Sequence, residues 1–191
     1  MPRMEFTRQT RKKIENVGYM ETLKKDNGTE LYIYGDIVSA ESDRWSAEDV
    51  CPQSISDFLQ SIEKDEDITL YVNSGGGDVF AGIAIHSILS RHTGHKTGIV
   101  DGMAASIASV ILMACDTIEI AKGAQIMIHK PLTFGYGNAD DFTKIVDKLD
   151  KCQQMITGIY MTKVLPDVTR EQIEAAINAE TWFNTEEAAQ L

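Results

Sequence analysis

Short apolar runs alternate with longer amphipathic stretches along most of this chain. Runs typical of buried strands occupy residues 31–37, 68–72, 96–100, 116–121 and 125–129. Apolar residues at helical spacing occupy residues 46–63, 79–91, 106–114, 138–165 and 169–179, and a last helix is expected to begin near Thr185. Strands that alternate with helices in this order predict an α/β fold.

The boundaries of these elements follow from local signals. Ser46 and Asp49 form a weak capping box that would open the helix over 46–63. Thr169 is expected to cap the helix that follows Pro166, where the long helix over 138–165 ends. That long helix is amphipathic, with apolar positions at Phe142, Ile145, Leu149, Cys152, Ile156, Ile159 and Tyr160.

The first 28 residues differ from the rest of the chain. They are rich in Arg, Lys, Glu, Asn and Thr, which predicts a polar arm that is mobile or ordered by a partner. We therefore expect an arm over 1–28 and one domain over 29–191. The N-terminus has no apolar region of the kind found in secretory signal peptides.

Composition narrows the class of protein. The 191 residues are 43% hydrophobic and 25% charged, which is ordinary for a globular protein, and the net charge is −11. An acidic surface argues against nucleic-acid binding, and the longest apolar run, residues 103–115, is too short to span a membrane. Three widely spaced cysteines predict neither a disulfide framework nor a metal site, and they fit the reducing cytoplasm. We expect a cytoplasmic location and neither a cofactor nor a metal.

Two short motifs carry candidate chemistry. Ser106 ends the sequence GMAAS and opens an apolar run, where the amino terminus of a helix would offer unpaired amides. His129 ends a short apolar strand and is followed two residues later by Pro131, a setting that would hold its ring. Taken singly, each is as well explained by ordinary packing; as a pair, they could form a nucleophile and its base.

Three consecutive glycines, Gly75, Gly76 and Gly77, follow the strand over 68–72. They lack the spacing and the lysine of nucleotide-binding loops, so phosphate binding is weakly supported. Alternatively, the amides of Gly77 and Ile107 could form an oxyanion hole with two donors. A simple turn from strand to helix would explain any one of these glycines, but it explains three in a row poorly.

Three ordered segments resemble the Clp protease proteolytic subunit (ClpP) family: YVNSGGGDVFAGIAIHSIL, DGMAASIASVILMA and QIMIHKPL. The resemblance covers about residues 30–191. It is closer still to the ClpP-related head maturation proteases of phages and prophages, on the segments LYIYGDI, GGGDVFAG and AETWFNTEEAAQL. It implies a crotonase-like αββ spiral in a single domain with a protruding handle helix.

The resemblance also implies roles for individual residues. Ser106 would be the nucleophile, His129 the general base, and Gly77 and Ile107 the oxyanion donors. Substrate would lie along Gly76 and along a segment that follows the base, which contains Thr133, Phe134 and Gly135. Glycines in that segment would let a peptide pair with it as an added strand.

Three features depart from the family pattern. The position of the family's aspartate holds Glu180, which is one methylene longer; other Ser-His hydrolases use glutamate in this role. Gly75 replaces the usual proline of the glycine loop. The chain ends at Leu191, before a strand that the family has, so we expect the full protein to continue beyond it.

These observations favour a serine endopeptidase that cleaves capsid or scaffold proteins during phage head assembly, in the bacterial cytoplasm or the infected host cell. The resemblance implies self-association into hexameric or heptameric rings, single or stacked. A cytoplasmic ClpP paralogue fed by an AAA+ unfoldase is the first alternative, although the basic arm does not resemble the apolar N-terminal loops of ClpP. The others are a crotonase-type acyl-CoA enzyme, which would not need a Ser-His pair, and a catalytically silent ring protein.

Overall fold

The computed structural model describes residues 4–10, 13–20 and 29–191, with side chains from residue 29 onward. Within the predicted polar arm over 1–28, residues 1–3, 11–12 and 21–28 lie outside the described residues. The described parts of the arm are two antiparallel strands, β1 (Met4–Thr10) and β2 (Lys13–Met20). The polar composition of the arm did not predict these strands.

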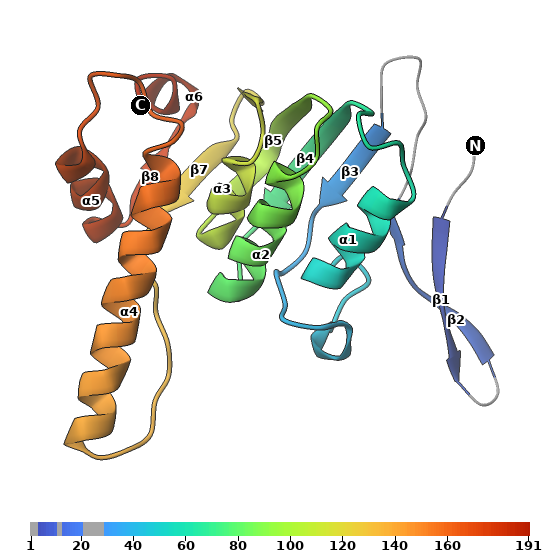
Figure 1. Cartoon of the computed structure of the whole chain (residues 1–191), viewed down its shortest axis with the longest axis horizontal. Helices are drawn as coiled ribbons and strands as arrows, with labels where there is room; N and C mark the ends of the chain where they lie inside the picture. Colours follow the sequence, from blue (N-terminus) through green and yellow to red (C-terminus); the bar gives the residue numbers. More distant parts are fainter. Residues whose placement is uncertain (1–3, 11–12, 21–28) are drawn as a thin grey trace.

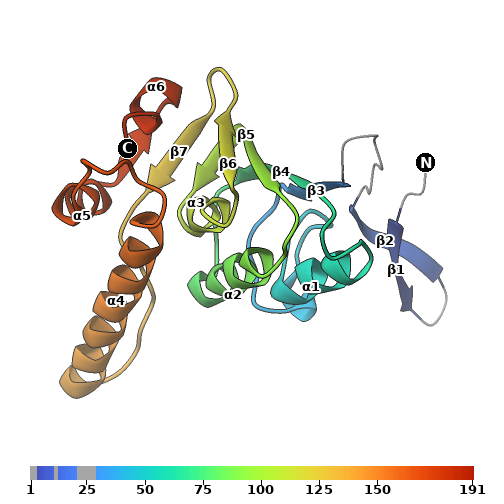
Figure 2. The same cartoon turned by 45° about the horizontal axis from the view of Figure 1, so that its top comes forward.

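The body of the protein contains one mixed sheet (Figure 1). Its path runs β3-β4-β5-β7-β8, and β6 pairs with the amino-terminal part of β5 beside β7 (Figure 2). All pairs are parallel except β7 with β8. The strands are β3 (Thr29–Ile33), β4 (Ile68–Ser74), β5 (Lys96–Ala105), β6 (Thr117–Ile120), β7 (Gln125–Ile128) and β8 (Thr181–Phe183).

Helices follow the strands in the order that the hydrophobic pattern predicts. Three of them, α1, α2 and α3, lie on the same face of the sheet (Figure 1). Between β7 and β8 the chain forms α4 and α5, and a short α6 follows β8. Their bounds are α1 (Pro52–Gln60), α2 (Val79–Ser90), α3 (Ile107–Leu112), α4 (Ala139–Tyr160), α5 (Arg170–Asn178) and α6 (Thr185–Ala188), and a 3-10 turn covers Glu41–Asp43.

The core lies between the sheet and this helical layer. Alternate residues of β4 are buried, as a strand with one covered face requires, whereas four of the five residues of β3 are buried. Leu31, Leu70 and Val72 meet the fully buried Phe58 of α1 and Ile85 of α2 in one cluster. Burying a side chain of this size contributes about 1.5–3 kcal/mol, so this layer supplies much of the driving force for folding.

Helix α4 protrudes from the body, as expected for a handle helix (Figure 1). Its buried residues all belong to its carboxyl-terminal half: Cys152, Ile156, Thr157 and Tyr160. The amino-terminal half exposes Phe142 and Val146. Only the second half of α4 is therefore anchored in the core. The helix ends at Tyr160, five residues before the predicted end.

The first helix begins later than Ser46. The carboxylate of Asp49 accepts hydrogen bonds from the backbone amides of Trp45 and Ser46 at 2.8 and 2.9 Å and from that of Asp36 at 3.1 Å. It thus closes a loop instead of capping a helix, and α1 starts at Pro52. Proline suits this first helical position because its missing amide would have no partner there.

Within the described ranges 4–10, 13–20 and 29–191, no helix combines the length and the apolar character that crossing a bilayer demands.

We expect Asp49→Asn to lower the free energy of unfolding by about 1–3 kcal/mol at pH 7, because an amide cannot replace a carboxylate that accepts three backbone hydrogen bonds. Burial raises the pKa of Asp49, but the amides of Ser46, Trp45 and Asp36 and the charge of Arg44 outweigh it and hold the pKa below its ordinary value of 3.8. The carboxylate therefore stabilises the fold above that pH and ceases to do so as the pH falls further.

Urea unfolding at pH 7 and near pH 3 tests this expectation. The difference between wild type and Asp49→Asn should shrink at the lower pH. Asp43→Asn, an exposed change in the same loop, is the matched control and should shift stability by no more than about 0.5 kcal/mol. Equal effects of the two variants at pH 7 would show that Asp49 does not hold the loop.

Candidate active site

Ser106 lies between the end of β5 at Ala105 and the start of α3 at Ile107. Its backbone has φ 54° and ψ −128°, a conformation that residues other than glycine rarely adopt. Its amide donates a 2.9 Å hydrogen bond to the carbonyl of Met127 in β7. The sharp turn from strand to helix leaves the side chain partly exposed at the carboxyl end of the strand.

His129 follows β7 directly, and the sheet brings it to the serine. Ala105 pairs with Met127, so the residues just beyond β5 and β7 are neighbours. The distance from His129 Nε2 to Ser106 Oγ is 2.7 Å, and both residues are partly buried. For the hydroxyl to donate in this hydrogen bond, the imidazole must be neutral with its proton on Nδ1. The predicted pair is therefore within hydrogen-bonding distance.

The glycine loop packs directly against this turn. Gly76 has φ 99°, and a Cβ placed there would lie 2.8 Å from Ser106 Cβ and 2.9 Å from the carbonyl oxygen of Ala105. Gly77 has φ 146°, and a Cβ there would lie 2.1 Å from the carbonyl oxygen of Ile37. Glycine is required at both positions because of the backbone angle and because of the close approach.

Ile37 holds the loop from the other side. Its amide donates to the carbonyl of Gly76 at 2.8 Å, and its carbonyl accepts from the amide of Asp78 at 2.7 Å. Asp78 in turn caps α2 by accepting from the amide of Ala81 at 2.7 Å. Sequence reasoning missed this role of Ile37. The only signal for it was that Ile37 is the apolar residue that ends the predicted strand over 31–37.

Both predicted oxyanion donors lie close to Gly76. The chain continues from Gly76 into Gly77, and a Cβ added to Gly76 would lie 3.1 Å from the nitrogen of Ile107. Among the described residues 29–191, neither the amide of Gly77 nor that of Ile107 donates a hydrogen bond. Each amide is thus available to an oxygen bound near Ser106.

Helix α2 fixes the position of Ile107. A Cβ placed on Gly82 would lie 2.2 Å from Ile107 Cγ1, so the two helices meet where α2 has no side chain. Ile107 itself is buried, with 3% of its surface exposed. The residue that carries one predicted oxyanion donor is therefore part of the hydrophobic core.

Glu180 lies near His129 in the sheet but forms no hydrogen bond with it in the described structure. Thr181 pairs with Ile128, so Glu180 and His129 lie one step beyond the last antiparallel pair. The backbone of Glu180 turns away from strand geometry with φ 52°, and the residue is exposed. Its assignment as the third catalytic residue stays a prediction.

The predicted substrate segment after His129 is also exposed. Phe134 has 97% of its surface exposed, and Thr133 and Gly135 are exposed as well. A Cβ on Gly135 would lie 2.6 Å from Ile145 Cδ1, so this loop runs along α4. The binding of substrate by these residues stays a prediction.

The other three histidines, His86, His92 and His95, are not part of the Ser106–His129 pair. The polar sequence HTGHK around His92 and His95 is typical of a solvated turn, but His92 is buried, and its Nε2 lies 2.6 Å from the carbonyl oxygen of Glu66. His95 is exposed as expected, and burial followed by the charge of Lys163 lowers the pKa of His86. No group of His, Cys, Asp or Glu within the described part of the chain could hold a metal ion.

Comparison with known proteins gives a match to the Clp protease family over residues 9–191. Two relatives are named ATP-dependent Clp protease proteolytic subunit. One, from Bacteroides fragilis, is 29% identical over 138 residues, which cover 69% of this chain and 63% of that protein. The other, from Bacteroides thetaiotaomicron, is 29% identical over 135 residues, which cover 69% and 60%.

The chain thus spans about three-fifths of the length of these curated relatives. The family match confirms the predicted α/β fold of ClpP type, to which the single mixed sheet with its helical layer conforms. It covers nearly the whole chain, including the serine turn, the histidine strand and the glycine loop. The chain belongs to the Clp protease family.

Proposed function

We propose that this protein is a serine endopeptidase. The observation that carries the proposal is the 2.7 Å distance between Ser106 Oγ and His129 Nε2 at the turn that follows β5. A serine hydroxyl is a weak nucleophile unless a neighbouring base takes its proton, and a neutral imidazole is suited to do so. Membership of the Clp protease family supports the same reaction.

The reaction would run in two halves. Ser106 Oγ attacks the carbonyl carbon of the scissile peptide while His129 Nε2 takes the hydroxyl proton. The tetrahedral intermediate collapses, the peptide C–N bond breaks, and His129 gives its proton to the leaving amine. Water then attacks the acyl-enzyme with His129 as base, which releases the carboxylic acid and returns the proton to Ser106 Oγ.

The amides of Gly77 and Ile107 would stabilise the negative charge that develops on the carbonyl oxygen. Both are backbone donors on rigid elements, the one held by Ile37 and the other by α3. Removal of one such donor costs on the order of 2.7–4 kcal/mol of barrier in a comparable enzyme. Glu180 would orient the imidazole and stabilise its charged form once its side chain turns toward Nδ1.

We further propose that the protein assembles into rings and acts on capsid or scaffold proteins. Support for the rings comes from the large apolar side chains exposed on the loop after β7 and on α4, namely Leu132, Phe134, Tyr136, Phe142 and Val146. Support for the phage role comes from the segments LYIYGDI, GGGDVFAG and AETWFNTEEAAQL. The names of the curated relatives favour a second candidate, a proteolytic subunit that receives its substrates from an ATPase.

A fluorophosphonate probe is expected to modify Ser106 in the assembled wild-type protein, because the probe reacts only with activated serines. Ser106→Ala should remove the adduct and lower peptide hydrolysis by at least about 10³-fold. Mass spectrometry locates the adduct. Ser90→Ala, an exposed change on α2, is the control and should label normally. An assembled protein without an adduct at Ser106 would refute the peptidase proposal.

Glu180→Gln is expected to lower kcat by about 10²-fold, less than Ser106→Ala, because a third residue orients the base without reacting itself. Steady-state hydrolysis of a peptide substrate measures the change. Glu186→Gln alters an exposed carboxylate in the next helix and serves as the control. Unchanged kcat in Glu180→Gln would mean that another group, or none, supports His129.

Gly76→Ala is expected to slow labelling of Ser106 by at least about 10²-fold, because the added methyl group would displace the serine and violate the preferred backbone angles. Gly75→Ala is the matched control, since a Cβ there would meet only Met103 Cε at 3.9 Å. The rate of fluorophosphonate labelling, with a melting curve for each variant, gives the comparison. Equal rates for the two variants would show that the close approach is unimportant.

A further inference from the structure

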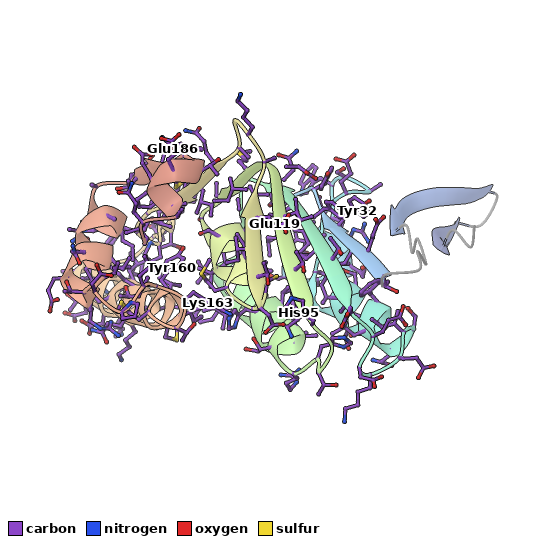
Figure 3. All side chains as sticks on the ribbon, turned by 90° about the horizontal axis from the view of Figure 1, so that it is seen from above. Tyr32, His95, Glu119, Tyr160, Lys163 and Glu186 are labelled. Carbon is purple, nitrogen blue, oxygen red and sulfur yellow. The ribbon has the colours of Figure 1, made fainter. Side chains whose placement is uncertain are left out.

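Two buried hydroxyl groups connect α4 to the nucleophile turn. The hydroxyl oxygen of Tyr160, the last residue of α4, lies 2.7 Å from Ser109 Oγ in α3. Ser109 Oγ lies 2.6 Å from the carbonyl oxygen of Ser106. Figure 3 shows Tyr160 where α4 meets the body of the protein. Ser109 has no exposed surface and Tyr160 has 6%.

The direction of these hydrogen bonds follows from the number of protons. A carbonyl oxygen can only accept, so Ser109 must donate its single hydroxyl proton to Ser106. Tyr160 must then be the donor to Ser109 Oγ. Burial raises the pKa of Tyr160 and outweighs the opposing effect of Ser109, so the phenol keeps its proton at neutral pH. The protons of the two groups thus point in sequence toward the carbonyl of Ser106.

That carbonyl belongs to the same peptide group as the amide of Ile107. It also accepts a hydrogen bond from the amide of Ser109 at 3.1 Å, so two donors on one residue fix its direction. A peptide group whose oxygen accepts hydrogen bonds has a more strongly polarised N–H, and successive hydrogen bonds in a low-dielectric interior strengthen one another. Whatever holds the carbonyl of Ser106 therefore also orients and strengthens the Ile107 donor.

We propose that Tyr160 and Ser109 form a positioning relay that orients and polarises the Ile107 amide as an oxyanion donor, an inference that rests on the proposed peptidase function. Neither residue touches the reacting atoms. Tyr160 also borders a cavity of about 10 Å³ beside Ser106 and His129, space for about one water molecule. The two buried hydroxyl groups therefore act on the backbone of Ser106, through Ser109, from the side of the hydrophobic core.

A catalytic role of the two hydroxyl groups can be distinguished from a purely structural role, in which they only satisfy buried hydrogen-bonding groups, because a relay acts in a fixed order. Tyr160 acts on Ser106 only through Ser109, so loss of the tyrosine hydroxyl should matter only when the serine hydroxyl is present. If the two hydroxyl groups served stability alone, their removal would lower the melting temperature, and kcat would not show this dependence of one hydroxyl on the other. A double-mutant cycle on catalysis separates the two cases.

The experiment measures kcat and KM for peptide hydrolysis by the assembled protein in four forms: wild type, Tyr160→Phe, Ser109→Ala and the double variant. We expect Tyr160→Phe to lower kcat about 5-fold with KM unchanged, the size that one net hydrogen bond implies. Ser109→Ala should lose at least as much, and the double variant no more than Ser109→Ala. The affinity for a peptide aldehyde, which forms a hemiacetal oxyanion on the serine, should fall in parallel.

Thr157→Val provides the matched control. It removes another fully buried hydroxyl of α4, one that donates to the carbonyl of Gln153 at 2.8 Å, and should leave kcat and aldehyde affinity unchanged. Losses that multiply in the double variant, unchanged kcat in Tyr160→Phe, or an equal loss in Thr157→Val would each overturn the relay while wild type stays active. A wild type without a Ser106 adduct would instead overturn the peptidase function, and the relay with it.

Discussion

Ser106 is held in a backbone conformation that it would not adopt alone, and the candidate site depends on this constraint. Its φ of 54° with ψ of −128° lies in a sparsely populated region, which costs on the order of 1–3 kcal/mol and persists only where the surroundings enforce it. The carbonyl of Met127 holds the amide of Ser106, and Gly76 lies directly behind the side chain. The sheet order β4-β5-β7 is what brings these three parts together.

Most elements of the fold could be predicted because each must bury one face. Parallel strands covered by helices leave a hydrophobic pattern in the sequence, and β4, α2 and α5 lie within a few residues of their predicted positions. The predicted start of the first helix at Ser46 was wrong because Asp49 accepts a hydrogen bond from the amide of Asp36, which is distant in the sequence. No local pattern contains such a contact. Strand β8 was missed because its three residues are too few to show periodicity.

The residues of the candidate site also differ in whether they could be predicted from the sequence. Ser106, His129 and the glycines could be found because each forms a short motif at the end of an element. The connection between Ser109 and Tyr160 spans 51 residues, and each of the two looks like an ordinary position on a buried helix face. Glu180 lies between these cases, since the strand register brings it beside His129 while the backbone turn leaves its side chain in solvent.

The contact between Gly82 and Ile107 affects how substitutions in this protein should be understood. Gly82 lies in the middle of α2, where a helix would gain stability from almost any other residue. A side chain there would push against Ile107 and so against the backbone that carries an oxyanion donor. In a comprehensive mutational screen for proteolysis, Gly82 would thus rank with the active-site residues, although its role is to leave space between two helices.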